Sequence, residues 1–278
     1  MSGAPLLARA GLLRGAAALI AGRGGGRARR GGGGMAAAFS SSPAAAAAAG
    51  GGAGAESGGK PIIRGVCFDM DGTLTVPVID FALMRRKGDI LDVINSWPEE
   101  ERARAYAAIA EIEAAALADM KLMPGLHELC EALDAAGVPR GLITRNVKSS
   151  VEYFHSNHLT SLNLSPFEPA ISRECAFPYK PSPAALLHVA ESWGVAPSEV
   201  VMVGDSPKDD IVCGNRAGAL TVLLDVDGRH SAGGAGELSG EAAPTHVVAS
   251  MGELRRLLLE RYRLLPPLRD QRAAAGAE

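Results

Sequence analysis

The chain has 278 residues, of which 47% are hydrophobic and 21% charged, and its net charge is −3. These values exclude a wholly disordered polyampholyte and a bundle of membrane helices, and the length corresponds to one or two domains. Residues 1–55 contain arginine but no Asp, Glu or Lys, so the rest of the chain is more acidic than the net charge indicates. An acidic body is a poor surface for nucleic acid, because neutralising phosphate requires clustered Lys and Arg.

Residues 1–59 are predicted to be a disordered transit peptide and linker. This segment consists mostly of Ala, Gly, Arg and Ser, and its leucines lie among arginines near the start. An Arg-rich beginning without acidic residues is typical of organelle transit peptides. The pattern favours the mitochondrion over the chloroplast, with a plain unstructured tail as the alternative. The apolar run is shorter than the ~18 residues that span a bilayer, so we expect a soluble protein without a membrane partner.

Beyond Lys60, short apolar runs alternate with helical patterns. The apolar runs cover residues 62–68, 138–143, 168–171, 200–203, 219–224 and 245–248. The helical patterns cover residues 125–136, 182–193, 208–217 and 252–264. Short runs that are apolar on both sides suit buried parallel strands. The alternation therefore predicts an α/β fold with a doubly wound parallel sheet, in which ligands bind beyond the carboxyl ends of the strands.

The domain boundaries follow from a break in this alternation. Residues 76–123 follow the first strand and lack strand character, and a long helix is expected from Pro98 onward. We interpret this insert as a small helical cap. The α/β core then comprises residues 60–75 and 124–265, and residues 266–278 form a C-terminal tail.

Polar residues suited to phosphate or magnesium chemistry follow several of the predicted strands. Asp69 and Asp71 end the first strand in the sequence Asp-Met-Asp-Gly-Thr, where Gly72 permits a tight turn. Two carboxylates two residues apart at the end of a strand can both turn toward one site. Thr144 follows the second run, and Gly204-Asp205 ends a later one.

In order and content, these motifs resemble those of the haloacid dehalogenase-like (HAD) hydrolases over roughly residues 62–250. Asp69 to Thr73 matches the first family motif, Thr144 the second, Lys180 the third, and Gly204 to Asp209 the fourth. The resemblance implies a Rossmann-like core, and the insert occupies the place of the family's C1 cap. The cap is shorter than in many phosphatases of the family, and the chain is similar to members of the phosphoglycolate phosphatase type.

The resemblance implies a Mg²⁺-dependent phosphatase that acts on a small phosphorylated metabolite. Asp69, Asp205 and Asp209, with the backbone carbonyl of Asp71, would bind Mg²⁺, which takes octahedral oxygen ligands. Asp69 would attack phosphorus to form an aspartyl-phosphate. Asp71 would protonate the leaving alkoxide and then activate the hydrolytic water. Asp209 competes with Asp210 for the metal, and spacing favours Asp209.

The remaining site residues are expected to contact the phosphate group. The Thr144 hydroxyl would hold phosphoryl oxygens, and Lys180, just before a helix N-terminus, would offset their charge. Arg145 and Asn146 are candidate substrate contacts, with a surface role, or for Asn146 a helix cap, as the alternative.

Two other functions compete with hydrolysis. Dehalogenases of the family lack an aspartate at the position of Asp71, so this residue favours phosphate chemistry. A sugar phosphomutase of the same family would keep the same aspartate pair under a fuller cap. A non-catalytic binding module would be expected to lose part of a self-repelling acidic cluster.

The four cysteines are far apart and form no CxxC pair, and no carboxylate pair adjoins the histidines, so no zinc or disulfide framework is expected.

Overall fold

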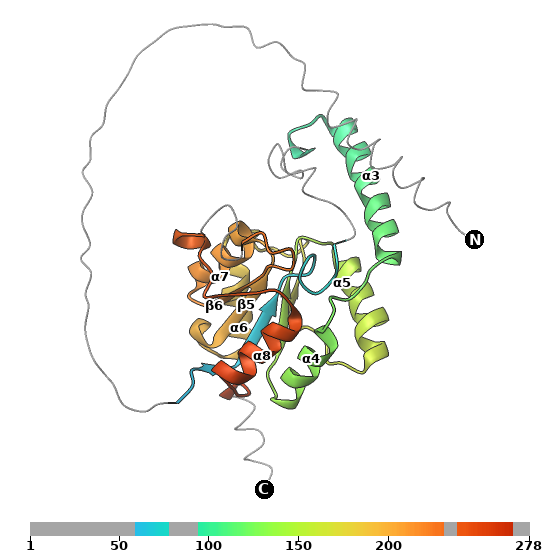
Figure 1. The fold of residues 1–278 in the computed structure, drawn as a ribbon. Helices are drawn as coiled ribbons and strands as arrows, with labels where there is room; N and C mark the ends of the chain where they lie inside the picture. Colours follow the sequence, from blue (N-terminus) through green and yellow to red (C-terminus); the bar gives the residue numbers. More distant parts are fainter. Residues whose placement is uncertain (1–58, 78–93, 231–237, 269–278) are drawn as a thin grey trace, which may run out of the picture. The chain divides into compact units, whose positions relative to one another are not determined.

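The structure is a computed structural model that describes residues 59–77, 94–230 and 238–268 (Figure 1). The predicted leader lies outside these residues apart from Gly59. Backbone contacts divide the chain into two units. The larger unit comprises residues 60–83 and 113–278, and the smaller comprises residues 1–59 and 84–112.

The larger unit is built on a six-stranded parallel sheet with the order β4-β3-β2-β5-β6-β7. The strands are β2 (Gly65–Phe68), β3 (Arg140–Ile143), β4 (Ala170–Ile171), β5 (Val200–Gly204), β6 (Leu220–Leu224) and β7 (His246–Val248). Each predicted apolar run contributes a strand to this sheet. The central strands β2, β3 and β5 are buried throughout, as expected for strands covered on both faces.

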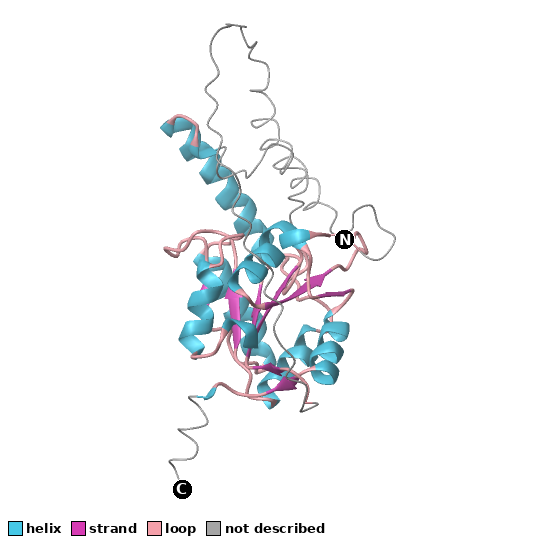
Figure 2. Ribbon diagram, turned by 90° about the vertical axis from the view of Figure 1, so that its left-hand side faces the viewer, coloured by secondary structure: helices cyan, strands magenta, loops and turns pink. Residues whose placement is uncertain are grey.

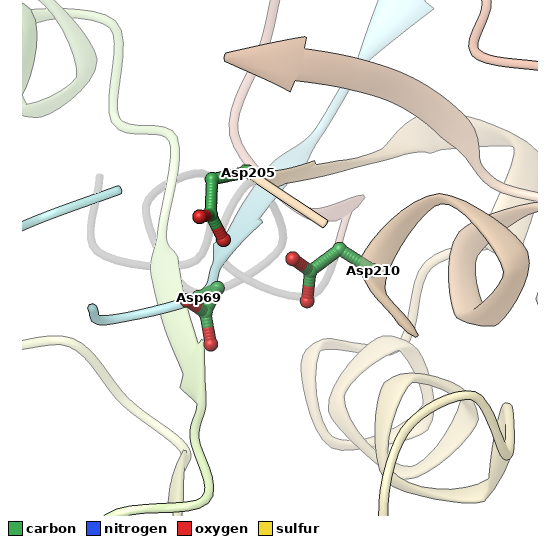
Figure 3. A group of neighbouring side chains, drawn as sticks. All are labelled: Asp69, Asp205 and Asp210. Atoms are coloured by element: carbon green, nitrogen blue, oxygen red, sulfur yellow. The ribbon is translucent and has the colours of Figure 1, made fainter. Parts of the chain in front are cut away.

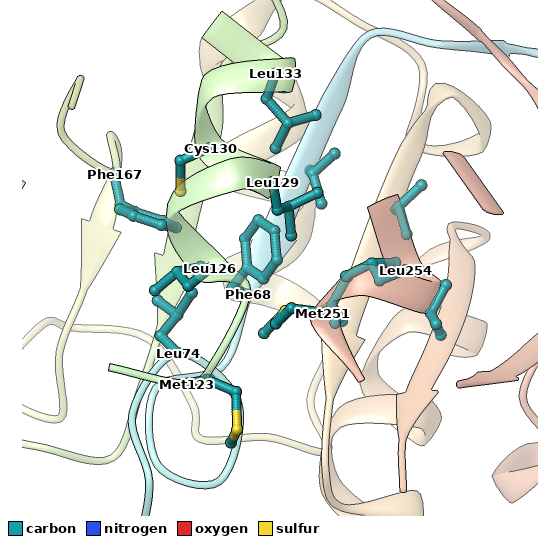
Figure 4. Close-up of a cluster of buried hydrophobic side chains, with 14 of the residues drawn as sticks. Phe68, Leu74, Met123, Leu126, Leu129, Cys130, Leu133, Phe167, Met251 and Leu254 are labelled. Carbon is teal, nitrogen blue, oxygen red and sulfur yellow. The ribbon is translucent and has the colours of Figure 1, made fainter. Parts of the chain in front are cut away.

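Helices cover both faces of the sheet (Figure 2). On one face, α4 (Leu126–Ala135), α5 (Lys148–Phe154) and α8 (Met251–Arg261) pack in one apolar cluster with Phe68 and Leu142. Figure 4 shows leucines of α4 and Met251 and Leu254 of α8 gathered around Phe68. On the other face, α6 (Ala184–Trp193) and α7 (Val212–Ala217) pack against Cys67 and Met202. The doubly wound α/β prediction is confirmed.

Short helical turns complete the connections of this unit. They are η2 (His155–Leu159), η3 (Thr160–Leu162), η4 (Pro197–Glu199), η5 (Pro207–Ile211) and η6 (Gly240–Ala242). The turn η5 lies directly after β5 and takes the first part of the helix predicted over residues 208–217. This turn determines where the side chains of the fourth motif lie.

A second, two-stranded sheet pairs β1 (Ile62–Ile63) with β8 (Arg263–Leu264). The predicted helix over residues 252–264 is therefore wrong at its end. Tyr262 is extended, with φ −124° and ψ 160°, and the N–H of Arg263 donates to the Pro61 carbonyl at 2.8 Å. Pairing with the start of the core replaces the last turn of helix.

The insert begins and ends at neighbouring positions of the larger unit. The N–H of Val76 donates to the Lys121 carbonyl, and the N–H of Met123 donates to the Leu74 carbonyl, both at 2.9 Å. Helix α3 (Glu99–Ala118) lies where a long helix was predicted, with three glutamates in its first turn, where the helix dipole favours negative charge. Residues 78–93 of the insert lie outside the described residues, and its role as a cap stays a prediction. Among the residues that the structure describes, no helix is long and apolar enough to cross a membrane.

Candidate active site

Three adjacent strands end in the residues that the sequence singled out. Asp69 follows β2, Thr144 follows β3 on one side of it, and Asp205 follows β5 on the other. Because all three strands are parallel, these residues lie at the same edge of the sheet. We refer to this end as the carboxyl edge, and to the end where the strands begin as the amino edge.

Three carboxylates gather at the carboxyl edge. One oxygen each of Asp69, Asp205 and Asp210 lies within 4.8 Å of the others, and Figure 3 shows the three side chains turned toward a common point. Two glycines make room for them. A Cβ atom at Gly72, whose φ is +81°, would lie 2.6 Å from Asp205 Oδ2, and one at Gly204 would lie 2.2 Å from Asp210 Cγ. The close approach of the carboxylates therefore depends on glycine at both positions.

Lys180 reaches the same point from the loop between β4 and α6. Its side chain is 4% exposed. Its ammonium group donates to Asp69 Oδ1 at 2.5 Å and to the Ile143 carbonyl at 2.8 Å, and it pairs with Asp210 Oδ1 at 2.7 Å. Lys180 therefore has two hydrogen-bond acceptors and one further ion-pair partner among the described contacts. The predicted proximity of Lys180 to Asp69 is present in the structure.

Burial shifts the pKa values of the ionisable groups at this point. Burial raises the pKa of Asp69 above its ordinary value, and Lys180 opposes that shift. Burial likewise raises the pKa of Asp210, again against Lys180. Burial alone lowers the pKa of Lys180, but the two carboxylates together raise it above its usual range. Among the described contacts, Lys180 pairs with two carboxylates whose burial disfavours ionisation, and additional positive charge would stabilise their ionised forms.

The structure differs from the sequence-based preference for Asp209 over Asp210. Asp209 accepts from the Ser206 hydroxyl at 3.0 Å and pairs with Arg145 at 3.1 Å, away from the three-carboxylate cluster. Asp210 turns back under Gly204, where it accepts from the Ser206 N–H at 3.0 Å and meets Lys180. The reason is the turn η5, which begins directly after Ser206 and points consecutive residues in different directions.

Asp71 lies beside the cluster on a tight turn. The N–H groups of Thr73, Leu74 and Thr75 all donate to the Met70 carbonyl, which fixes the turn. The amide of Asn146 donates to Asp71 Oδ2 at 2.9 Å. Asn146 is therefore in contact with a predicted catalytic residue, and the sequence did not indicate this contact.

Thr144 and Arg145 have partners from their own and neighbouring loops. The Thr144 hydroxyl accepts from the Asn146 N–H at 3.0 Å, a bond that does not use the hydroxyl proton. Arg145 donates to the Lys180 carbonyl at 2.6 Å and to Asp209. Arg145 thus links the loops that contain the second, third and fourth motifs.

The comparison with family models and known proteins agrees with this arrangement. The model of the haloacid dehalogenase-like hydrolases matches residues 63–218. A haloacid dehalogenase-like hydrolase domain-containing protein of Arabidopsis thaliana is 43% identical over 225 residues, covering 74% of this chain and 88% of that protein. The chain belongs to the haloacid dehalogenase-like hydrolase family.

More distant relatives carry more specific names. Phosphoglycolate phosphatase 1 of Pseudomonas aeruginosa is 31% identical over 222 residues, which are 69% of this chain and 78% of that enzyme. Among solved structures, a predicted phosphoglycolate phosphatase from Haemophilus somnus matches with a TM-score of 0.55 and 19% identity, covering 70% of this chain and 97% of its own. The second comparison supports the fold alone.

Proposed function

We propose that the protein is a Mg²⁺-dependent phosphatase that hydrolyses a small phosphorylated metabolite through an aspartyl-phosphate intermediate. The proposal rests on one observation above all. One oxygen each of Asp69, Asp205 and Asp210 lies within 4.8 Å of the others, and the buried Lys180 ammonium pairs with Asp69 and Asp210. Three converging carboxylate oxygens form a set of hard donors that fits a hard divalent cation.

The residues of the cluster match the needs of Mg²⁺ in charge and donor type. Asp69, Asp205 and Asp210 would hold the ion, and the Asp71 carbonyl and Asp209 stay candidates for completing its shell. When bound, Mg²⁺ supplies positive charge that offsets the phosphate dianion. Lys180 contributes a further positive charge that is already held in position by two carboxylates and a carbonyl.

The chain's own residues account for the two chemical steps. In the first, a carboxylate oxygen of Asp69 forms a bond to phosphorus while the ester P–O bond breaks, and Asp71 gives its proton to the leaving alkoxide. In the second, Asp71 takes a proton from water as the water oxygen attacks phosphorus and the bond to Asp69 breaks. The Thr144 hydroxyl proton and the Lys180 ammonium hold the phosphoryl oxygens in both steps. Arg145 and Asn146, predicted as substrate contacts, already have partners within the site.

The relatives favour a small substrate. The Pseudomonas aeruginosa relative is named as a phosphoglycolate phosphatase, and it aligns with 69% of this chain. We therefore propose a phosphorylated small acid or a similar metabolite as substrate class.

The decisive experiment measures phosphate release by the full-length protein. Purified protein should release phosphate from p-nitrophenyl phosphate when Mg²⁺ is added, and chelation should stop the reaction. Asp69→Asn should reduce the rate at least about a thousandfold, since the nucleophile is removed. Asp227→Asn, at an exposed position outside the cluster, serves as the matched control. Equal rates for wild type and Asp69→Asn would reject the enzyme and favour a binding module, whereas transfer of phosphate to a second sugar position would favour a phosphomutase.

We propose further that the N-terminal leader directs the protein to an organelle, with the mitochondrion favoured. The arginine-rich, acid-free composition of residues 1–55 supports this proposal. Microscopy of the full chain fused at its C-terminus to a fluorescent protein should show organellar fluorescence. Diffuse fluorescence would reject the proposal.

A further inference from the structure

A hydrogen bond between two distant segments singles out Asn146. Its Nδ2 donates to Asp71 Oδ2 at 2.9 Å, although the two residues are 75 positions apart. Asn146 follows β3, and Asp71 lies on the turn after β2. The bond therefore links the second-motif loop directly to the side chain proposed as general acid and base.

The backbone of Asn146 is fixed on both sides. Its N–H donates to the Thr144 hydroxyl at 3.0 Å, and its carbonyl accepts from the Arg173 N–H at 3.0 Å. Two bonds of this kind restrict the rotation of the loop around Asn146. The amide is consequently presented to Asp71 from a rigid support, as precise placement of a catalytic group requires.

A residue other than Asn146 accepts a hydrogen bond from the backbone at the start of α5. Asparagine just before a helix commonly caps it by accepting from backbone N–H groups. Here α5 begins at Lys148, and its N-cap residue Val147 makes no side-chain hydrogen bond to the helix. Glu174 from a neighbouring loop accepts from the Lys148 N–H at 2.5 Å instead. Asn146 lies one position before the N-cap, and its side chain bonds to Asp71 and not to the helix backbone.

We infer that Asn146 is a positioning residue that holds the carboxyl group of Asp71 where it can transfer a proton to the leaving group. The inference rests on the proposed phosphatase function and adds a residue to it. The amide occupies one lone pair of Oδ2 and so fixes the plane of the carboxyl group. In the first step the proton passes from Asp71 to the departing oxygen as the ester P–O bond breaks and the bond from Asp69 forms. The Thr75 hydroxyl also donates to Asp71 Oδ1 at 3.4 Å. Loss of Asn146 therefore removes one of the contacts that orient the carboxyl group, and proton transfer becomes slower.

The test compares two substrates of nearly the same shape, phenyl phosphate and p-nitrophenyl phosphate. The phenolate that leaves from phenyl phosphate is the more basic of the two and needs the proton more. The quantity measured is kcat/KM, which reports the steps up to phosphoryl transfer. For Asn146→Ala we expect kcat/KM to fall about a hundredfold on phenyl phosphate, the lower end of what general acid catalysis contributes, and about tenfold or less on p-nitrophenyl phosphate.

The controls separate positioning from other roles. A purely structural residue, or one that contacts the phosphoryl group, would lower both kcat/KM values by the same factor, and that result would overturn the inference. Unchanged kcat/KM on both substrates would overturn it as well. Asn157→Ala removes an asparagine whose amide bonds only to the nearby Tyr153 carbonyl among the described contacts, and it should change neither value. If Asn146→Ala fails to fold by circular dichroism, Asn146→Ser gives the same comparison.

Failure of the inference differs from failure of the proposed function. If the wild type releases no phosphate from either ester with Mg²⁺, the phosphatase itself is rejected. If the wild type is active and the two substrates respond equally to Asn146→Ala, only the role of Asn146 is rejected.

Discussion

Two basic side chains are buried at opposite ends of β3, and their surroundings differ. At the amino edge, Arg140 is 2% exposed, and its Nη2 donates to both oxygens of Asp134 at 3.0 and 3.1 Å and to the Ser165 carbonyl at 2.7 Å. At the carboxyl edge, Lys180 pairs with Asp69 and Asp210, and Asp205 lies close by. Among the described contacts, Arg140 pairs with one carboxylate at the first end, and Lys180 pairs with two at the second.

This difference separates a structural ion pair from the proposed active site. Arg140 and Asp134 neutralise each other, and the guanidinium also lies over the Phe167 ring at 5.1 Å. Nothing further is needed there for charge balance. At the carboxyl edge, two buried carboxylates share one ammonium among the described contacts, and an added cation would stabilise this arrangement. The local charge balance therefore distinguishes the two edges better than burial does.

The largest expected effect comes from removing the cation at the carboxyl edge. Lys180→Met keeps most of the side-chain volume but removes the ammonium group. We expect kcat for phosphate release to fall about a hundred- to a thousandfold, as when one electrostatic donor of a transition state is lost. Phosphate release from p-nitrophenyl phosphate measures the change, and retention of more than half of the wild-type kcat would contradict the role of Lys180.

The matched change at the amino edge should affect stability instead. Breaking a buried ion pair costs about 3–5 kcal/mol, and the partial exposure of Asp134 reduces that to about 2–4 kcal/mol for Arg140→Met. We expect kcat/KM to stay within about twofold of wild type, because the pair is remote from the reaction. Urea unfolding followed by circular dichroism gives the free energy of unfolding. A large loss of kcat/KM at unchanged stability would remove the distinction between the two edges.

Magnesium should stabilise the fold through the carboxyl edge. A ligand at a hundred times its Kd adds about 2.7 kcal/mol to the free energy of unfolding. We expect this Mg²⁺-dependent gain in the wild type and in Asp209→Asn, and its loss in Asp210→Asn. Thermal unfolding with Mg²⁺ and with a chelator measures the gain for each protein against its own metal-free value. If Asp209→Asn loses the gain and Asp210→Asn keeps it, the sequence-based choice of ligand is restored.

The smallest expected effect is a pH dependence that does not involve the carboxyl edge. Burial lowers the pKa of His155, and Glu168 partly opposes the shift. The unfolded chain then binds a proton at higher pH than the folded one, so stability decreases as pH falls below the ordinary value of 6.5. Because the side chain is only half buried, the decrease should be small.

The test for His155 is the urea midpoint at about pH 7.5 and about pH 5.5, where histidines change their charge. The decrease between these values should be smaller in His155→Gln than in the wild type. Equal decreases in the two proteins would assign the pH dependence to other groups.

The fold and the position of the site were predictable because they depend on local patterns. Apolar runs ending in Asp69, Thr144 and Gly204-Asp205 predict parallel strands with polar residues at one edge, and the structure has this arrangement. The motifs also placed Lys180 at the same edge, and in the structure Lys180 contacts Asp69 there.

The features that the sequence did not predict depend on contacts between distant segments. Arg263 and Leu264 continue a helical pattern, but pairing with Ile62 and Ile63 makes them a strand. The choice between Asp209 and Asp210 depends on the turn η5, which directs Asp210 beneath Gly204. Residue spacing alone contains neither piece of information.

The pairing of β1 with β8 has a practical consequence for attaching other molecules to the protein. It brings the segments near Pro61 and Leu265 together at the amino edge, one strand length from Asp69. An affinity handle or surface anchor joined near either segment is held away from the carboxylate cluster at the carboxyl edge. Trimming the chain before Arg263, by contrast, would remove the second strand of this pair and expose the backbone of the first.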